Sequence, residues 1–418
     1  MKLNVLELFA GVGGFRLGLE GWNGKSAISG YEEPLKRKVQ FEVVHSNQFE
    51  PSTKRQHANE VYESRFGTVG HFGRSVEEVG ASDFSKQIDV LCGGFPCQDY
   101  SVATTLRNSK GLLGKKGVLW WEIERLLTEL VNKPPYLILE NVDRLLKSPS
   151  GRRGRDFAVM LRSLSELGYN VEWKVIDASE WGFPQRRKRV FIVGYQRSIS
   201  DKYLGLLESA FPFESKLSSR EFELDADIET ISNDFGVGDL VSKFGNDGHY
   251  INGVVYTSDV RYEKIEGNVL ADVLEPIECV SSDYHVKDID FEKWVYLKGA
   301  KKIIRTSKNG HSYNFAEGAM SFPDSLNKPS RTIITSEGGA TPSRFKHVIL
   351  QDNVHRRLTP KELERLNGFP DDWTRVEGII DSRRSFFMGN ALVVGIIEMI
   401  ADALSEYHYQ SIISRLSK

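Results

Sequence analysis

The chain has few cysteines and no long apolar segment. Its 418 residues include three cysteines, Cys92, Cys97 and Cys279. This odd number, at these spacings, suits neither a disulfide framework nor a zinc site. No stretch approaches the ~18 apolar residues of a membrane helix, and the first apolar run is too short for a signal peptide. We therefore expect no metal, no membrane partner and a reducing, cytoplasmic location.

An excess of charge of either sign is also missing. The chain has 55 Lys and Arg against 57 Asp and Glu, a formal net charge of −2. Overall charge thus gives no sign of a nucleic-acid partner, and a DNA-binding protein with this balance must cluster its basic groups on one face. The hydrophobic fraction of 40% and the length indicate a globular protein of two or more domains.

The first half of the chain alternates short apolar runs with segments of helical periodicity. Near-continuous apolar strands that alternate with helices predict an α/β fold, with a mostly parallel sheet covered on both faces. The predicted strands span 3–9, 41–44, 88–92, 136–139, 171–176 and 190–193, and the predicted helices span 15–20, 52–66, 117–130 and 156–169.

Polar side chains and glycines follow four of these strands. Ligands of such sheets bind outside the carboxyl ends of the strands, so we expect these residues to converge on one crevice. They are the turn Ala10–Gly14, then Gln48 and Glu50, then Cys97 and Gln98, and finally Glu140 and Asn141.

A cysteine after a strand and a proline suggests nucleophilic chemistry, because loops commonly carry catalytic groups. A free thiol has a pKa of about 8.5, so partners must raise its thiolate fraction. His45 and His71 lie in no recognisable motif, which leaves a protease-like Cys–His pair unsupported. The arginines of the segment 185–189 are the expected positive groups. In the glycine turn, Arg16 stands where the pyrophosphate-binding motif G-x-G-x-x-G has its third glycine, so the turn matches that motif only weakly.

Five motifs in order carry a family resemblance: FAGVGGF, GGFPCQ, ENV, QRRKR and MGNAL. Together they resemble the C5-cytosine DNA methyltransferases over residues 3–197 and 329–405. The resemblance implies a Rossmann-like domain that uses S-adenosylmethionine. It further implies a catalytic domain in two parts, 1–197 and 329–418, with a smaller, irregular target-recognition domain at 198–328 between them.

The resemblance also assigns chemical roles. Cys97 would add to C6 of a flipped cytosine, and Glu140 would hold or protonate N3. Arg189 would contact the base oxygen or a phosphate, with Arg187 supporting it. In an extended segment Arg186 and Lys188 would then point to solvent. Gln98 and Asn141 complete the predicted catalytic set.

For the cofactor, the resemblance places Phe9 and Phe49 beside the adenine and the glycine turn near the methionine part. Gln48 stands where the family often has Glu for the ribose, and Glu50 is close by. The predicted cofactor-binding set is Phe9, Ala10, Gly11, Gly13, Gly14, Gln48, Phe49, Glu50, Ser75, Val76, Pro96, Leu119, Asn390 and Ala391.

The expected partner is double-stranded DNA, and a restriction endonuclease would be the functional counterpart. One target base per event allows a monomer to suffice. We expect clustered basic groups along the DNA cleft. The predicted DNA-binding residues are Ser101, Lys110, Lys115, Lys298, Lys301, Lys302, Arg305, Arg331 and Arg344.

The last part of the chain carries two helix signals. Thr359 and Glu362 form a capping box with Pro360 at the first helical position, which predicts a helix ending near Gly368. Residues 389–406 predict one amphipathic helix that returns to the first domain.

Three other functions compete with DNA methylation. A tRNA cytosine methyltransferase of the same superfamily is disfavoured by the long recognition region. A catalytically silent DNA-binding relative is disfavoured by the presence of Cys97, Glu140 and the arginines. A thiol hydrolase lacks an evident histidine partner.

Overall fold

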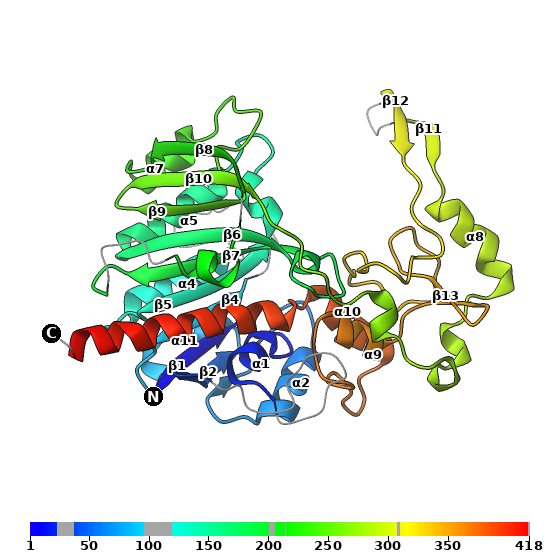
Figure 1. The fold of residues 1–418 in the computed structure, drawn as a ribbon, viewed down its shortest axis with the longest axis horizontal. Coiled ribbons are helices and arrows are strands. Elements are labelled where there is room, and N and C mark those ends of the chain that lie inside the picture. Colours follow the sequence, from blue (N-terminus) through cyan, green and yellow to red (C-terminus); the bar gives the residue numbers. More distant parts are fainter. Residues whose placement is uncertain (23–36, 96–118, 200–204, 214, 307–309, 417–418) are drawn as a thin grey trace.

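The computed structural model describes residues 1–22, 37–95, 119–199, 205–213, 215–306 and 310–416. Figure 1 shows a larger lobe built around one sheet and a smaller lobe that carries α8 (Asp288–Lys298) and a protruding pair of strands. The carboxyl ends of the first strands point toward the smaller lobe, so the predicted site residues that follow these strands in the described part of the chain lie on that side.

The sheet of the larger lobe has ten strands in the order β3-β2-β1-β4-β5-β7-β6-β9-β10-β8. The strands from β3 to β5 are parallel, and each later strand is antiparallel to its neighbour, so β6 and β10 run in the direction of β1. The predicted α/β class is confirmed. The strands are β1 (Lys2–Leu8), β2 (Gln40–Asn47), β3 (His71–Phe72), β4 (Val90–Gly94), β5 (Tyr136–Val142), β6 (Tyr169–Asp177), β7 (Lys188–Gln196), β8 (Ser215–Glu223), β9 (Asp247–Ile251) and β10 (Val254–Arg261).

Helices cover both faces of this sheet, as the apolar strands predicted. One apolar cluster packs one face against α1, α2, α6 and α11, and a second packs the other face against α4, α5 and α7. The bounds are α1 (Gly14–Glu20), α2 (His57–Phe66), α4 (Leu119–Glu129), α5 (Arg155–Glu166), α6 (Leu206–Ala210), α7 (Ile228–Asp234) and α11 (Val394–Leu416). The short α2 starts five residues later than expected.

The segment after residue 198 does not leave the sheet at once. Strands β9, β10 and β8 extend the sheet beyond β6, and α7 packs against α5. The start expected for a separate domain at residue 198 therefore lies within the larger lobe. Alternating buried side chains on β10 let this segment add strands, a pattern that its acidic loops obscure in the sequence. The smaller lobe begins after β10.

The C-terminal segment that returns to the larger lobe forms two helices, where the sequence predicted one helix over residues 389–406. α10 (Asp381–Asn390) ends before Ala391, and α11 begins at Val394. The break follows from Asn367, whose side-chain amide donates to the Met388 carbonyl at 2.8 Å while its own carbonyl accepts the Val394 N–H at 2.9 Å. By contrast, α9 (Pro360–Leu366) starts with the predicted Thr359–Glu362 capping box.

No single helix in the described ranges is long and apolar enough to cross a membrane, although α10 and α11 pass that test together as a pair bent by 41°.

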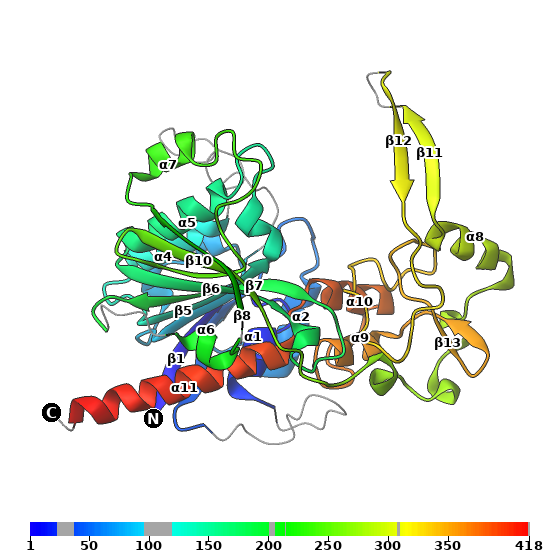
Figure 2. The same cartoon turned by 45° about the horizontal axis from the view of Figure 1, so that its top comes forward.

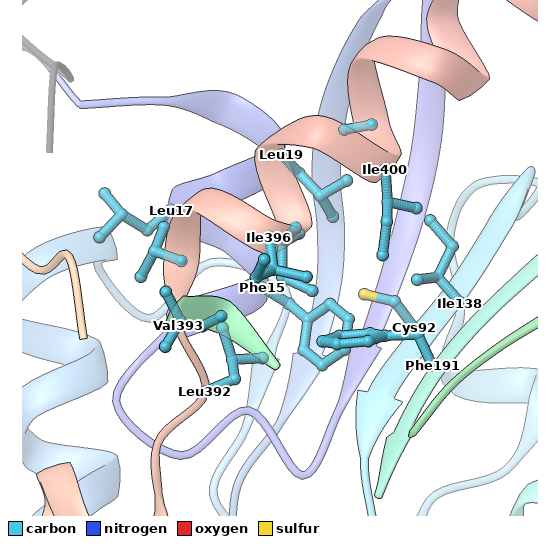
Figure 3. Packing of buried hydrophobic residues seen from close by; sticks show 14 of the residues in the cluster. Phe15, Leu17, Leu19, Cys92, Ile138, Phe191, Leu392, Val393, Ile396 and Ile400 are labelled. Carbon is cyan, nitrogen blue, oxygen red and sulfur yellow. The ribbon is translucent and has the colours of Figure 1, made fainter. Parts of the chain in front are cut away.

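The return helix α11 packs directly on α1 and the sheet. Figure 3 shows Ile396 and Ile400 of α11 beside Phe15 and Leu19 of α1, with Cys92 of β4 in the same cluster. Cys92 is fully buried.

Glu7 anchors the start of α1 from inside the sheet. Its carboxylate is fully buried and accepts the Arg16 N–H in the first turn of α1 at 3.2 Å and the Tyr62 hydroxyl at 2.8 Å. The helix has no side-chain cap at Gly13, so Glu7 satisfies one of its free N–H groups. Burial raises the pKa of Glu7 to about 7, against the opposing effects of Tyr62 and Arg16.

The α1–α11 contact yields a prediction for Gly18. A Cβ at this position would lie 2.7 Å from the Ile397 Cβ and 3.0 Å from the Val394 carbonyl oxygen. Gly18→Ala should lower the free energy of unfolding by about 1–3 kcal/mol, despite a gain in helix propensity of about 1 kcal/mol. Urea unfolding measures this. Gly151→Ala, where a Cβ meets nothing within 4 Å, is the control and should have little effect. A stable Gly18→Ala protein would contradict the close packing.

The raised pKa of Glu7 predicts a pH dependence of stability. The folded state holds this proton more tightly than the unfolded chain, so the group loses stabilisation as pH rises from about 4.5 to about 7. Glu7→Gln should gain stability relative to the wild type across that window, by up to about 3 kcal/mol. Unfolding of both proteins at several pH values gives the difference. For Glu42→Gln the trend should reverse, because hydrogen bonds from Lys86 and Lys2 lower the pKa of Glu42.

Candidate catalytic and cofactor-binding site

Parallel pairing brings the predicted strand ends together. β4 lies between β1 and β5, and Gly94, the last residue of β4, pairs with Glu140. Because β7 runs antiparallel to β5, its first residues lie at this same edge, where Arg189 pairs with Val142. The segment 185–189 therefore meets Glu140 through the reversed direction of β7.

Glu140 and Arg189 form an ion pair at this edge. The Arg189 Nε lies 2.9 Å from the Glu140 Oε1, and the two side chains are 17% and 13% exposed. Burial raises the pKa of Glu140 above its ordinary value, while the charges of Arg189 and Arg187 oppose that rise. The glycine before the loop is needed here, because a Cβ at Gly94 would lie 3.0 Å from the Glu140 Oε2.

Arg187 lies buried behind this pair. Its Nη2 donates to the Gly389 carbonyl at 3.0 Å, and within the described residues its Nε and Nη1 have no hydrogen-bond acceptor. Burial and the neighbouring Arg189 lower the pKa of Arg187 well below its ordinary value. Arg186 and Lys188 are exposed, so the predicted alternation of the two pairs is confirmed.

Asn141 contacts the protein backbone rather than an open site. Its amide nitrogen donates to the Phe95 carbonyl at 3.0 Å, and its oxygen accepts the Val142 N–H at 2.9 Å. Both ends of the buried Asn141 amide therefore have backbone partners, and its expected catalytic role stays a prediction. Asn141 fixes the last described residue of the loop that leads to Cys97.

Several predicted residues lie outside the part of the chain that the structure describes. These are Pro96, Cys97, Gln98, Ser101, Lys110 and Lys115.

The glycine turn after β1 has the backbone strain expected of a functional loop. Phe9 has a positive φ of 54°, and Gly11 and Gly13 have φ of 58° and 89°. The Ala10 N–H donates to the Asn47 carbonyl at 3.0 Å, which ties the turn to the end of β2. Among the residues that the structure describes, a Cβ at Gly11 would meet nothing within 4 Å.

The two polar residues after β2 have protein partners. Gln48 accepts the Gly11 N–H with its Oε1 at 2.7 Å, so its carbonyl supports the glycine turn. Glu50 forms an ion pair with Arg383 of α10. Of the two predicted ribose contacts, Gln48 thus has only its amide nitrogen left to offer, and the Glu50 carboxylate is shared with Arg383.

The other predicted cofactor residues border the same end of the sheet or the return segment. Phe49 is 36% exposed, as an aromatic partner for a flat ring would be, whereas the Val76 side chain is buried. Leu119 opens α4, and Asn390 is exposed at the end of α10, next to Ala391. Ser75 precedes the short turn Val76–Glu78.

Three residues of this site carried no predicted role. The Trp373 indole donates to the Val12 carbonyl at 2.7 Å, and Arg383 holds Glu50. Gln185 is fully buried and donates to the Asn367 oxygen at 2.8 Å. A tryptophan directly after the GFPDD turn was the one signal in the sequence, but its partner lies 361 residues away along the chain.

The predicted DNA-binding basic residues are not all on the surface. Lys298 is 1% exposed and donates to the Lys346 carbonyl at 2.6 Å. Arg331 makes two hydrogen bonds to Asp324, at 2.8 and 3.2 Å. Arg344 donates to the carbonyls of 297 and 299. The burial of Lys298 contradicts its predicted place on a DNA-binding surface, whereas Arg331 and Arg344 are only partly covered by their partners in the smaller lobe.

Two of the basic residues remain exposed, Lys302 and Arg305. Lys301 is largely covered and lies 3.8 Å from Glu317.

Comparison with known proteins gives a consistent result. Residues 3–406 match the family described as C-5 cytosine-specific DNA methylase. The chain is 45% identical to Type II methyltransferase M.Sau3AI of Staphylococcus aureus, over 97% of this chain and 96% of that protein. It is 26% identical to Type II methyltransferase M.BanI of Aneurinibacillus aneurinilyticus, over 100% and 99% of the two chains.

Solved structures share the fold. The S. pombe Dnmt2 methyltransferase has a TM-score of 0.57 and 17% identity, covering 97% of this chain and 99% of its own. A Spodoptera frugiperda DNMT2 mutant has a TM-score of 0.59 and 14% identity, covering 96% and 99%. With the motifs, the paired Glu140 and Arg189, and the family match over nearly the whole length, the chain belongs to the C-5 cytosine-specific DNA methylases and is a DNA (cytosine-5-)-methyltransferase.

Proposed function

We propose that this enzyme methylates C5 of a flipped cytosine within one short sequence of double-stranded DNA, through covalent addition of the Cys97 thiolate to C6. The observation that carries the proposal is the half-buried Glu140–Arg189 pair at the carboxyl end of β5, beside the strand that leads to Cys97. In this pair, an acid whose pKa is raised by burial contacts a cation, next to the end of the strand that precedes Cys97 in the sequence.

Cytosine C5 is a poor nucleophile until C6 is attacked. When the thiolate bonds to C6, the π electrons of the C5=C6 double bond shift through C4 toward N3, and N3 takes up a proton. The resulting C4=C5 double bond is an enamine, which makes C5 nucleophilic. C5 would then bond to the methyl group as the bond between that methyl and the sulfonium sulfur of the donor breaks, and the electron pair of the broken bond stays on sulfur. Loss of the C5 proton to a base and departure of the thiolate restore the aromatic ring. The protein must therefore hold a thiolate at one face and neutralise charge at the opposite edge.

Glu140 suits the second task. Its raised pKa increases the fraction that carries a proton, and a neutral carboxyl can donate that proton to N3 as the thiolate adds. When the thiolate leaves, the same proton can return to Glu140. Arg189, bound to Oε1, orients the carboxyl group and presents a cation to the base oxygen or a nearby phosphate. The buried Arg187 adds positive charge behind both.

The glycine turn and its neighbours fit S-adenosylmethionine. Among the described residues, a Cβ at Gly11 would meet nothing within 4 Å, and Phe49 offers a half-exposed ring for the adenine. When bound, this cofactor supplies an electrophilic methyl group on a sulfonium. Gln48 and Trp373 keep the turn in place by holding Gly11 and Val12.

The substrate and the setting follow from the chemistry and the relatives. C5 and C6 lie inside the stacked duplex, so the base must leave the stack, which costs a few kcal/mol. The two relatives compared above are Type II methyltransferases by name. We infer that this enzyme protects host DNA from a cognate restriction endonuclease, and one base per event lets a monomer act.

Mapping of the product tests the proposal. Duplex DNA of many sequence contexts, incubated with the protein and methyl-labelled S-adenosylmethionine, should gain 5-methylcytosine within one short motif. The Cys97→Ala variant should bind cofactor and DNA but transfer no methyl group, because no thiolate can add to C6. Label confined to tRNA would reject the DNA proposal in favour of RNA modification. No label in either would indicate a silent DNA-binding protein.

Glu140→Gln should reduce the single-turnover rate by about 10²–10⁴-fold without weakening cofactor binding, since an amide cannot transfer a proton to N3. Because Glu140 acts in its protonated form, the wild-type rate should also fall as pH rises through the raised pKa of this group, and the variant should lack that limb. Rapid-quench kinetics over a pH series measure both. An unchanged rate in Glu140→Gln would remove Glu140 from the chemistry.

A further inference from the structure

Two strands of the smaller lobe form a ribbon that stands apart from the rest of the molecule. β11 (Lys301–Thr306) and β12 (Ser312–Glu317) pair antiparallel with each other and join no other sheet. Figures 1 and 2, which differ by a 45° rotation, both show the ribbon projecting from the smaller lobe beyond α8. An isolated two-stranded ribbon is marginally stable in water, so a partner that covers it would stabilise it.

The register divides the ribbon into two faces. Residues directly opposite each other on paired strands share a face, and successive residues alternate between faces. The pairs Ile303–Phe315 and Arg305–Tyr313 therefore lie on one face. We call the other the Ile304–Asn314 face, and its three pairs are Lys302–Ala316, Ile304–Asn314 and Thr306–Ser312.

The first face is occupied by its own contacts. The Arg305 guanidinium lies 3.3 Å from the centre of the Phe315 ring, and the Lys301 ammonium lies 4.7 Å from that of Tyr296 at the base of the ribbon. Such cation–π contacts stiffen the ribbon and hold its positive charges in place.

The side chains of the Ile304–Asn314 face are exposed and make few contacts within the described part of the protein. Ile304 is 75% exposed, and Asn314 is also exposed. In the described part of the chain the Asn314 amide makes no hydrogen bond. Ile304 and the free amide of Asn314 lie side by side on an uncovered ribbon. Such a surface favours aggregation unless a partner covers it.

We propose that this ribbon enters the major groove of the substrate duplex and that Ile304 and Asn314 read an A·T base pair there. The inference rests on the proposed DNA methylation. A two-stranded ribbon fits the major groove, which is about 12 Å wide. An asparagine amide pairs with both N6 and N7 of adenine, and an apolar side chain contacts the thymine methyl group. Lys302 is exposed on the same face and can reach a flanking phosphate.

The test uses the full-length enzyme and a panel of duplexes. The preferred sequence comes from methylation mapping of the wild type. Each duplex of the panel changes one base pair of that sequence. Ile304→Ala with Asn314→Ala should reduce kcat/KM on the preferred sequence by about 10–100-fold, and should shrink discrimination at one A·T position by a similar factor. S-adenosylmethionine affinity should match the wild type, which reports an intact larger lobe.

A matched control variant and a variant with changed specificity distinguish sequence-specific base contacts from nonspecific contacts with DNA. Ile289 of α8 is 89% exposed in the same lobe but off the ribbon, so Ile289→Ala should act as the wild type. Asn314→Asp keeps size and exposure, and its carboxylate accepts from cytosine N4. It should therefore shift preference at that position from A·T toward C·G.

Three results would overturn the proposal: an equal loss of rate at every sequence, no change in the double variant, or a ribbon that mediates only self-association. Absence of 5-methylcytosine with the wild type itself would instead reject the proposed function.

Discussion

The buried side chain of Gln185 links the segment just before β7 to the second half of the chain, and the position of Arg189 depends on this link. A fully buried amide must find partners for both its donor and its acceptor, or its desolvation costs about 1–3 kcal/mol. Gln185 donates to the Leu366 carbonyl at 3.2 Å and accepts the Ile333 N–H at 3.1 Å. Leu366 ends α9, in the part of the chain that returns to the larger lobe, and Ile333 lies earlier in the same second half of the chain. Two residues further on, Arg187 donates to Gly389 of the same return.

This junction helps to set the position of Arg189. β7 begins just after it, and Arg189 meets Glu140 because the first residues of β7 are fixed against the return segment. The cofactor side is supported in the same way, by Trp373 on the Val12 carbonyl and by Arg383 on Glu50. The smaller lobe thus lies between two parts of the chain that pack together in the larger lobe.

Two largely buried carboxyl groups lie at the carboxyl edge of the sheet, and burial raises the pKa of each. Glu7 holds the first turn of α1, next to the cofactor turn, and Glu140 holds Arg189. Burial of a carboxylate costs stability, which the fold recovers through hydrogen bonds and ion pairs. At Glu7 these partners are Tyr62 and the Arg16 N–H, and at Glu140 the partner is Arg189. The same polypeptide edge serves both because parallel strands place their ends side by side.

The sequence by itself determined the α/β class and the alternation of Arg186 and Lys188 with the inward arginines. These features follow from local periodicity, which a few neighbouring residues encode. Only the tertiary structure decided that β8 to β10 extend the first sheet, and that Lys298 is buried. Lys298 looks like any surface lysine in the sequence, but Asp324 and the Lys346 carbonyl, 26 and 48 residues away, hold it inside. Burial is set by what the folded chain brings into contact, and those partners are distant in sequence.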